Sequence, residues 1–401
     1  MSRTLDAEVQ LHGRRVGELR YDRGGSAFTY EDQLGNPSHQ ILGQIFEDDP
    51  RTVRRVRVGV PAWFANLLPE GELRRQIIRE MGGGNIGEFT LLLRLGRYLP
   101  GAVTVRGESE PDDDVNLDDP ARVTPDHPIR HSQAGVQLKY TVPGERLTFP
   151  ASGNKAWWTV KLPDRALREL VLNEYLTMRW LMASDFYVPP VQVAPAKAVG
   201  GIPPGLVEAS ELVYLIERFD RTASGRVHFE DFAQVADVAP IFKYSESGAT
   251  YDSLAVVIRQ LTGMDGYADY VRRLTAMLIV GNTDAHLKNW ALVYYDGRTP
   301  SLAPMYDFHS LTVYDRYRYT PLALSLNGER VPSSIGLDDF RRMAEGSECD
   351  PEQTVGWVTQ AIRRLRETWF GELKTETEHR FPALAQHYSH RINSLPICGE
   401  T

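Results

Sequence analysis

The chain has 401 residues, of which 45 are Lys or Arg and 53 are Asp or Glu, so its net charge is -8. This balance argues against a protein that coats nucleic acid and against one that adheres to strongly anionic membranes. The length predicts two or three folding units. Cys349 and Cys398 lie without a Cys-x-x-Cys spacing, which excludes a thiolate zinc site and a disulfide framework. With neither an apolar leader nor a membrane span in the sequence, we expect a cytoplasmic protein.

The first hundred residues predict a β-rich domain over residues 1–106. Residues 7–21 alternate apolar and polar positions around a turn at His12, which is typical of a β-hairpin, and residues 51–60 alternate again. Residues 62–83 become helical, with acidic residues in a first turn and glycines at the end. Residues 88–105 predict a helix, a loop and a short strand.

An acidic, proline-rich stretch over residues 107–128 predicts a linker. Strand patterns follow at 135–142, 146–150 and 156–163, then a helix over 165–183, and strands at 197–203 and 211–221. Beyond residue 228 the patterns are mostly helical. We therefore expect an α+β, protein-kinase-like bilobal fold, with a strand-rich lobe over residues 129–220 and a helical lobe over residues 221–401.

The segment GNTDAHLKNW, residues 281–290, directly follows the apolar run TAMLIV. Asp284 stands five residues before Asn289, and Asp307 follows a predicted pair of short strands. Protein kinases use this arrangement: one Asp orients the substrate hydroxyl, while the Asn and the second Asp hold Mg²⁺. Each aspartate alone is better explained as a cap or turn residue, but together they favour phosphoryl transfer.

Lys161 ends a predicted strand, and Glu174 lies on the next predicted helix, a spacing similar to the kinase lysine and its helical glutamate. Lys161 alone would be an ordinary surface lysine. The stretch SQAGVQLK supplies a turn before a strand with a single glycine, so it is no complete phosphate-binding loop. YLIERFDR follows an apolar strand, where a hinge would present its backbone to adenine.

The chain resembles the HipA family of bacterial serine/threonine kinase toxins, because seven of its segments occur in the order and spacing of that family. They are SQAGVQLK, WTVKLP, NEYLTMRW, LIERFDR, DFAQVADVAPIFKY, GNTDAHLKNW and APMYDFHS. HGRRVGELR, FANLLPEGELRR and LGRYLPGAV resemble the N-terminal domain of the same family. DFH in place of DFG and GNTD in place of HRD argue against control by activation-loop phosphorylation.

The resemblance implies roles for individual residues. Asp284 would be the catalytic aspartate, aided by His286 and Lys288, and Asn289 and Asp307 would hold Mg²⁺. ATP would meet the phosphate-loop region, the strand lysine and the hinge, namely Gly135, Val136, Gln137, Lys139, Lys161, Glu217 and Phe219. Glu174 and Ser132 would be regulatory, since a phosphate on Ser132 would add negative charge where the phosphates of ATP must lie. Lys243 and Tyr244 match the family's activation-loop region.

The family implies an ATP- and Mg²⁺-dependent protein serine/threonine kinase that acts as the toxin of a toxin–antitoxin pair. It also implies an aminoacyl-tRNA synthetase or another translation protein as substrate. A HipB-like helix-turn-helix antitoxin would be the partner, and DNA would be contacted only through it. Two alternatives remain open: a small-molecule kinase of the aminoglycoside-phosphotransferase type, and a catalytically silent kinase fold that acts as a binding module.

Overall fold

The structure is a computed structural model that describes residues 5–22, 24–31, 39–107, 139–143, 157–199, 202 and 205–399. Ser132, Gly135, Val136, Gln137, the linker and the strand predicted at 146–150 lie outside these residues, as does the side chain of Lys139. In the described part of the chain, no helix is long and apolar enough to cross a membrane.

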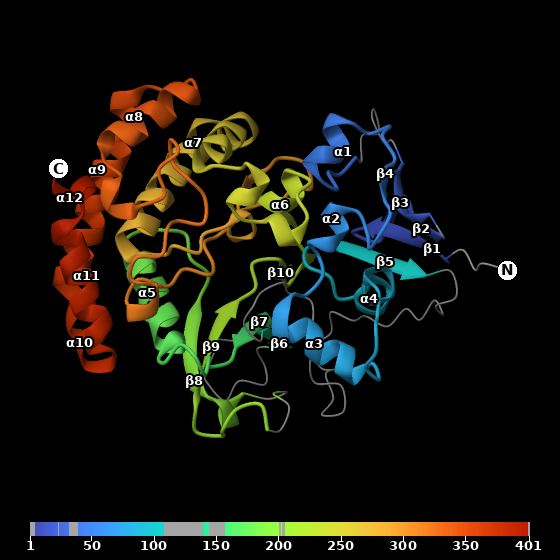
Figure 1. Cartoon of the computed structure of the whole chain (residues 1–401), viewed down its shortest axis with the longest axis horizontal. Helices are drawn as coiled ribbons and strands as arrows, with labels where there is room; N and C mark the ends of the chain where they lie inside the picture. Colours follow the sequence, from blue (N-terminus) through green and yellow to red (C-terminus); the bar gives the residue numbers. More distant parts are fainter. Residues whose placement is uncertain are drawn as a thin grey trace. The chain divides into compact units, whose positions relative to one another are not determined.

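The chain divides into two compact units, and Figure 1 labels helices and strands in the sequence order of the chain. The first contains Met1–Leu162, Ala194–Ile241 and Val293–Thr299, and the second contains Pro163–Val193, Phe242–Leu292 and Pro300–Thr401. The domain boundaries expected from the sequence stay a prediction. Each unit is described by itself.

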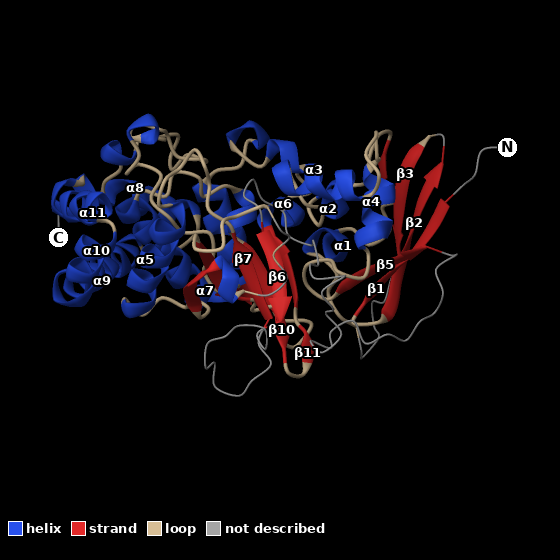
Figure 2. Ribbon diagram, turned by 90° about the horizontal axis from the view of Figure 1, so that it is seen from below, coloured by secondary structure: helices blue, strands red, loops and turns tan. Residues whose placement is uncertain are grey.

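The first unit contains a five-stranded sheet in the order β4-β3-β2-β1-β5 (Figure 2). Its strands are β1 (Leu5–Leu11), β2 (Arg14–Asp22), β3 (Gly25–Tyr30), β4 (Arg54–Val56) and β5 (Val103–Gly107). The β1–β2 pair is antiparallel, and His12 and Gly13 both have positive φ between the two strands. Two such residues make a hairpin turn whose twist matches the strands, which confirms the predicted hairpin.

Helices α1 (Gln44–Asp48), α2 (Ala62–Ala65), α3 (Gly71–Glu80) and α4 (Glu88–Leu95) accompany this sheet. Phe28 on β3 packs edge-on against Phe46 and Phe64, at ring distances of 5.2 and 4.7 Å. These rings are at most 1% exposed. Aromatic side chains bury large apolar areas, so this cluster forms the centre of the N-terminal core.

A second sheet has the order β6-β7-β9-β8, and its strands β6, β7 and β9 belong to the first unit. It consists of β6 (Lys139–Pro143), β7 (Trp157–Lys161), β8 (Val191–Pro195) and β9 (Leu212–Glu217). The strand predicted over residues 197–203 is wrong at its start, because Ala196–Ala198 is a 3-10 helix. There the amide of Val199 donates to the carbonyl of Ala196 at 3.0 Å, which closes a turn.

The chain after β9 forms β10 (Arg221–Thr222), β11 (Gly225–Arg226), β12 (His228–Asp231) and α6 (Phe232–Val235), and β12 neighbours β13 (Ala291–Tyr294). Glu230 on β12 is fully buried. Its carboxylate accepts hydrogen bonds from the amide of Gln44 at 2.9 Å, from Trp63 Nε1 at 3.1 Å and from the Tyr294 hydroxyl at 2.5 Å. This one carboxylate therefore joins Gln44, Trp63 and Tyr294, which lie far apart in the sequence of the first unit.

The second unit is mainly helical (Figure 2), as predicted. It contains α5 (Leu170–Ala183), α7 (Tyr251–Val280), the short strand β14 (Ser301–Leu302), α8 (Leu337–Gly346), α9 (Pro351–Thr368), α10 (Lys374–Arg380), α11 (Pro382–Ser394) and α12 (Pro396–Gly399). Trp180 on α5 meets Trp369 and Tyr388 at ring distances of 4.9 and 4.8 Å. α5 is buried along most of its length, as expected of a helix with apolar residues on every side.

Helix α7 ends in a Schellman motif at Gly281, where φ is 73°. The amide of Gly281 donates to Leu278 O at 3.3 Å, and the amide of Asn282 donates to Met277 O at 3.1 Å. These two bonds satisfy carbonyls that a helix end otherwise leaves without a partner. The position of Gly281 therefore sets the point at which the next segment leaves the helix.

We predict that Gly281→Ala lowers the free energy of unfolding by more than about 2 kcal/mol, because left-handed backbone costs a residue with a Cβ about 1–2 kcal/mol. The new Cβ would also lie 2.0 Å from Thr312 Oγ1. Gly356→Ala on α9 is the control, since its Cβ would meet nothing within 4 Å, and it should stabilise by about 0.5–1 kcal/mol. Urea unfolding measures both, and equal stabilities would contradict the prediction.

We predict that Glu230 makes stability fall as the pH rises from about 5 to about 7. Burial raises the pKa of Glu230 to about 7 from an ordinary 4.5, against its three hydrogen bonds. Between these pKa values the folded state binds more protons than the unfolded state, so the free energy of unfolding decreases with pH, by at most about 1.4 kcal/mol per unit. Denaturant unfolding from pH 5 to pH 8 should show a smaller decrease for Glu230→Gln. Parallel curves would contradict this.

Candidate active site

The polar segment at residues 281–290 forms a loop whose own groups hold its backbone. The side chain of Asn282 accepts the amide of Asp284 at 3.3 Å, and the side chain of Asn289 accepts the amide of His286 at 3.2 Å. The Tyr251 hydroxyl donates to the carbonyl of Ala285 at 3.0 Å. Side-chain amides that bond to nearby backbone favour turns over helix. The amides therefore fix the loop on which Asp284 stands.

Asp284 is half-buried, and the hydroxyl of Tyr244 donates to its Oδ1 at 3.0 Å. Burial raises the pKa of Asp284 above its ordinary value, while His309, the Tyr244 hydrogen bond and Lys243 lower it and Asp307 raises it. The carboxylate thus has a hydroxyl group directly on one oxygen. A group in this position can orient a hydroxyl and accept its proton.

Asn289 and Asp307 lie next to each other in the second unit. Asn289 Nδ2 donates to Asp307 Oδ2 at 3.5 Å, and Asn282 Nδ2 donates to the carbonyl of Asp307 at 3.4 Å. Asp307 has a φ of 60°, a conformation that costs a non-glycine residue free energy and is enriched at functional sites. The structure brings together the acid and the amide that the sequence pairs, 18 residues apart.

The donor set of this pair suits Mg²⁺, which prefers hard oxygen ligands and is commonly held by one or two carboxylates together with phosphate oxygens. Asp307 is half-buried and supplies carboxylate oxygens. Asn289 would supply its amide oxygen, which has two lone pairs and uses one of them here to accept the amide of His286. Over the described residues, no group of three or more His, Cys, Asp or Glu side chains could hold a metal by itself. The residues therefore fit a metal shared with a phosphate ligand.

The segment after Asp307 is anchored on α5. Asn173 Nδ2 donates to the carbonyl of Ser310 at 2.7 Å, and the amide of Ser310 donates back to Asn173 Oδ1 at 2.9 Å. Glu174 follows on the same helix and is 1% exposed. Its expected partner Lys161 belongs to the first unit, so that ion pair stays a prediction.

His286 and Lys288 are both buried in the loop. The ring of Tyr244 meets His286 edge-on at 5.0 Å, and the Tyr306 hydroxyl donates to the carbonyl of Lys288 at 3.0 Å. His286 therefore packs behind the tyrosine that contacts Asp284. A catalytic role for either residue stays a prediction.

The residues predicted to bind nucleotide lie in the first unit. Lys161 is buried, with its Nζ 5.7 Å from the centre of the Tyr214 ring, and its backbone pairs with that of Lys139. Glu217 and Phe219 are half-exposed at the end of β9. Burial raises the pKa of Glu217. A role for these residues in nucleotide binding stays a prediction.

The sequence does not predict the contacts that Tyr244 and Asn282 make in the site. Tyr244 matches the family's activation-loop region in sequence, and in the structure its hydroxyl bonds to Asp284 across a separation of 40 residues. Asn282 was seen only as part of a polar run, although it contacts both Asp284 and Asp307. An asparagine two residues before a candidate aspartate is a recognisable turn signal, whereas nothing local indicates the tyrosine.

Family models match both the N-terminal and the C-terminal part of the chain. Residues 7–106 match the family model of the HipA N-terminal domain, and residues 131–369 match that of the HipA-like C-terminal domain. The chain is 37% identical to "Putative kinase Y4dM" of Sinorhizobium fredii over 388 residues, 93% of each protein. It is 31% identical to a second kinase-named protein of that organism, Y4mE, over 76% of this chain and 77% of the relative.

A solved complex of HipA, HipB and operator DNA from Shewanella oneidensis contains a chain that resembles this one with a TM-score of 0.73. The two are 20% identical, and the match covers 98% of each. This likeness confirms the α+β, protein-kinase-like fold. With two family models and a relative matched over nearly its whole length, the chain belongs to the HipA family.

Proposed function

We propose that this chain is an ATP- and Mg²⁺-dependent serine/threonine-protein kinase that acts as the toxin of a toxin–antitoxin pair. One observation carries the proposal: Asn282 bonds to the backbone of both Asp284 and Asp307, and Asn289 bonds to the carboxylate of Asp307. Membership of a family with kinase-named relatives supports it as well.

In the proposed reaction Asp284 orients the hydroxyl of the acceptor and takes its proton. A carboxylate of modest basicity suffices, because phosphoryl transfer depends mainly on positioning and charge stabilisation. Asn289 and Asp307 would hold Mg²⁺, which when bound neutralises charge on the phosphates. Lys161 would contact phosphate oxygens, and the hinge at Glu217 and Phe219 would receive adenine.

The partners follow from the family. HipB accompanies HipA in the solved Shewanella oneidensis complex, and we propose a HipB-like helix-turn-helix antitoxin for this chain. An aminoacyl-tRNA synthetase or another translation protein is the proposed substrate, and autophosphorylation of Ser132 is the proposed self-limiting step. Lys243 and Tyr244 lie beside Asp284, where a protein acceptor would approach.

We predict that Asp284→Asn lowers ATP-dependent phosphorylation by about 10²–10⁴-fold, because a positioned general base contributes that factor. The measurement is intact and peptide mass spectrometry of the chain after incubation with Mg²⁺ and ATP, together with ADP release. Asp315→Asn is the control, since that carboxylate is 90% exposed, and it should retain wild-type activity.

Equal activity of Asp284→Asn and wild type would contradict the catalytic assignment. Phosphate transfer to kanamycin, with none to the chain itself or to a bacterial lysate, would favour the small-molecule kinase. Absence of both ATP binding and turnover in the wild type would favour the silent binding module.

We predict that Tyr244→Phe moves the acidic limb of the pH–rate profile to higher pH. The Tyr244 hydroxyl lowers the pKa of Asp284, so its loss raises that pKa and leaves less ionised base at a given acidic pH. The rate of ATP turnover from pH 5 to pH 8 measures the limb. Tyr319→Phe, at a side chain 90% exposed, is the matched control, and identical limbs in all three proteins would disprove the coupling.

A further inference from the structure

The hinge segment after β9 has one exposed side and one buried side. Glu217 and Phe219 are half-exposed, whereas Arg218, Asp220 and Arg221 are 5%, 2% and 8% exposed. The amide of Arg218 donates to the carbonyl of Trp157 on β7 at 2.7 Å. The residues proposed to meet adenine therefore alternate with residues directed into the protein.

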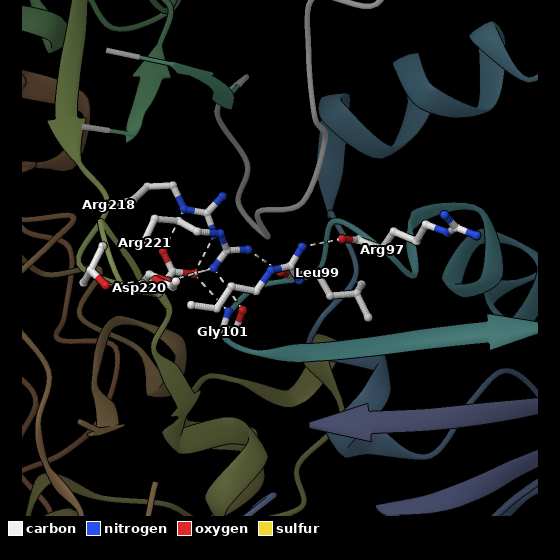
Figure 3. A network of polar contacts seen from close by, with 9 residues as sticks. Arg97, Leu99, Gly101, Arg218, Asp220 and Arg221 are labelled. Carbon is white, nitrogen blue, oxygen red and sulfur yellow. Dashed lines mark hydrogen bonds and ion pairs between the residues drawn. The ribbon is translucent and has the colours of Figure 1, made fainter. Parts of the chain in front are cut away.

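Asp220 is the centre of the buried side. Its carboxylate accepts Arg218 Nε at 2.7 Å, Arg221 Nη1 at 2.8 Å and the backbone amide of Gly101 at 2.9 Å (Figure 3). Burial would raise the pKa of Asp220, but the two guanidinium groups outweigh it and hold that pKa well below its usual range. The group is thus an ionised acid whose bonds require a particular geometry.

The side chains of Asp220 and Arg221 also bond to a loop of the N-terminal domain, residues 97–102. Arg221 donates through Nη1 to the carbonyl of Gly101 at 2.9 Å and through Nη2 to that of Leu99 at 3.0 Å. Arg226 donates to the carbonyl of Arg97 at 2.7 Å. Figure 3 shows Arg218, Asp220 and Arg221 gathered against this loop. All these residues belong to the first unit.

Gly101 gives a second route from the loop to the hinge. Its φ is 67°, and a Cβ there would lie 3.0 Å from His228 Nδ1 and 3.2 Å from the backbone of Phe229. The ring of Phe229 packs edge-on against Phe219 at 5.0 Å. A Cβ at residue 101 would therefore crowd His228 and Phe229 and would also be strained by the positive φ.

We infer that the loop at residues 97–102 of the N-terminal domain is a structural part of the nucleotide-binding hinge, with Gly101 and Asp220 as positioning residues. The inference rests on the proposed function, because it takes Glu217 and Phe219 as the adenine contacts. Gly101 fixes Phe219 through Phe229, and Asp220 fixes the hinge backbone through Arg218. The N-terminal domain then contributes to nucleotide affinity without touching the nucleotide.

The test is the affinity of Gly101→Ala for MgATP, measured by isothermal titration calorimetry, with KM and kcat for ATP turnover. The expected result is a Kd raised at least about tenfold, equivalent to about 1.4 kcal/mol, with kcat changed less than KM. Gly13→Ala is the matched control, because Gly13 has a similar φ of 75° in the same domain but nothing within 4 Å of its Cβ. It should bind MgATP as the wild type does.

Asp220→Asn should raise KM for ATP in the same way. Hydrogen exchange on the wild type does not depend on how any variant folds: MgATP should slow exchange at residues 97–101 as well as at 217–221. Protection confined to 217–221, or wild-type affinity in folded Gly101→Ala, overturns the inference. A wild type that binds no MgATP contradicts the proposed function itself.

Discussion

The left-handed backbone of Gly281 decides where the polar loop leaves the helix. The carbonyl of Gly281 accepts the amide of Leu311 at 3.1 Å, and Arg391 donates to the carbonyl of Ile279 at 2.9 Å, so other segments hold the helix end as well. Each helical residue turns the chain by about 100°. Ending α7 one residue earlier or later would therefore direct Asp284 away from Tyr244 and separate Asn282 from Asp307.

The first unit stabilises two buried acids in different ways. Two arginines compensate Asp220 and hold its pKa low, whereas the described partners of Glu230 are neutral donors and burial raises its pKa to about 7. Both join the N-terminal domain to the segment after β9. Polar groups buried at such a junction are costly when their partners move, so they select one arrangement of the joined segments. Apolar packing alone would tolerate small displacements.

Much of this could be predicted from local sequence. The hairpin and the mostly helical chain beyond residue 228 follow from periodicity and turn residues, and the pairing of Asn289 with Asp307 follows from their kinase-like spacing. The contacts that complete the site could not, because their partners are far apart: 40 residues for Tyr244 and Asp284, 119 for Gly101 and Asp220, and 137 for Asn173 and Ser310. Local patterns reveal which side chains are unsuited to a core, but only the tertiary fold chooses their partners.

The contact between Tyr244 and Asp284 also bears on how the proposed base is positioned for an acceptor hydroxyl. The bonds that hold Asp284 come from the protein itself, so the loop is already ordered when the protein has folded and need not be ordered again at each turnover. The Tyr244 hydroxyl occupies one acceptor site on Oδ1 of Asp284, and an ionised carboxylate has about four such sites, so a substrate hydroxyl can bond to Asp284 while Tyr244 stays in place. For the proposed kinase, this tyrosine would therefore orient the base and lower its pKa while leaving acceptor sites for the hydroxyl of a bound protein.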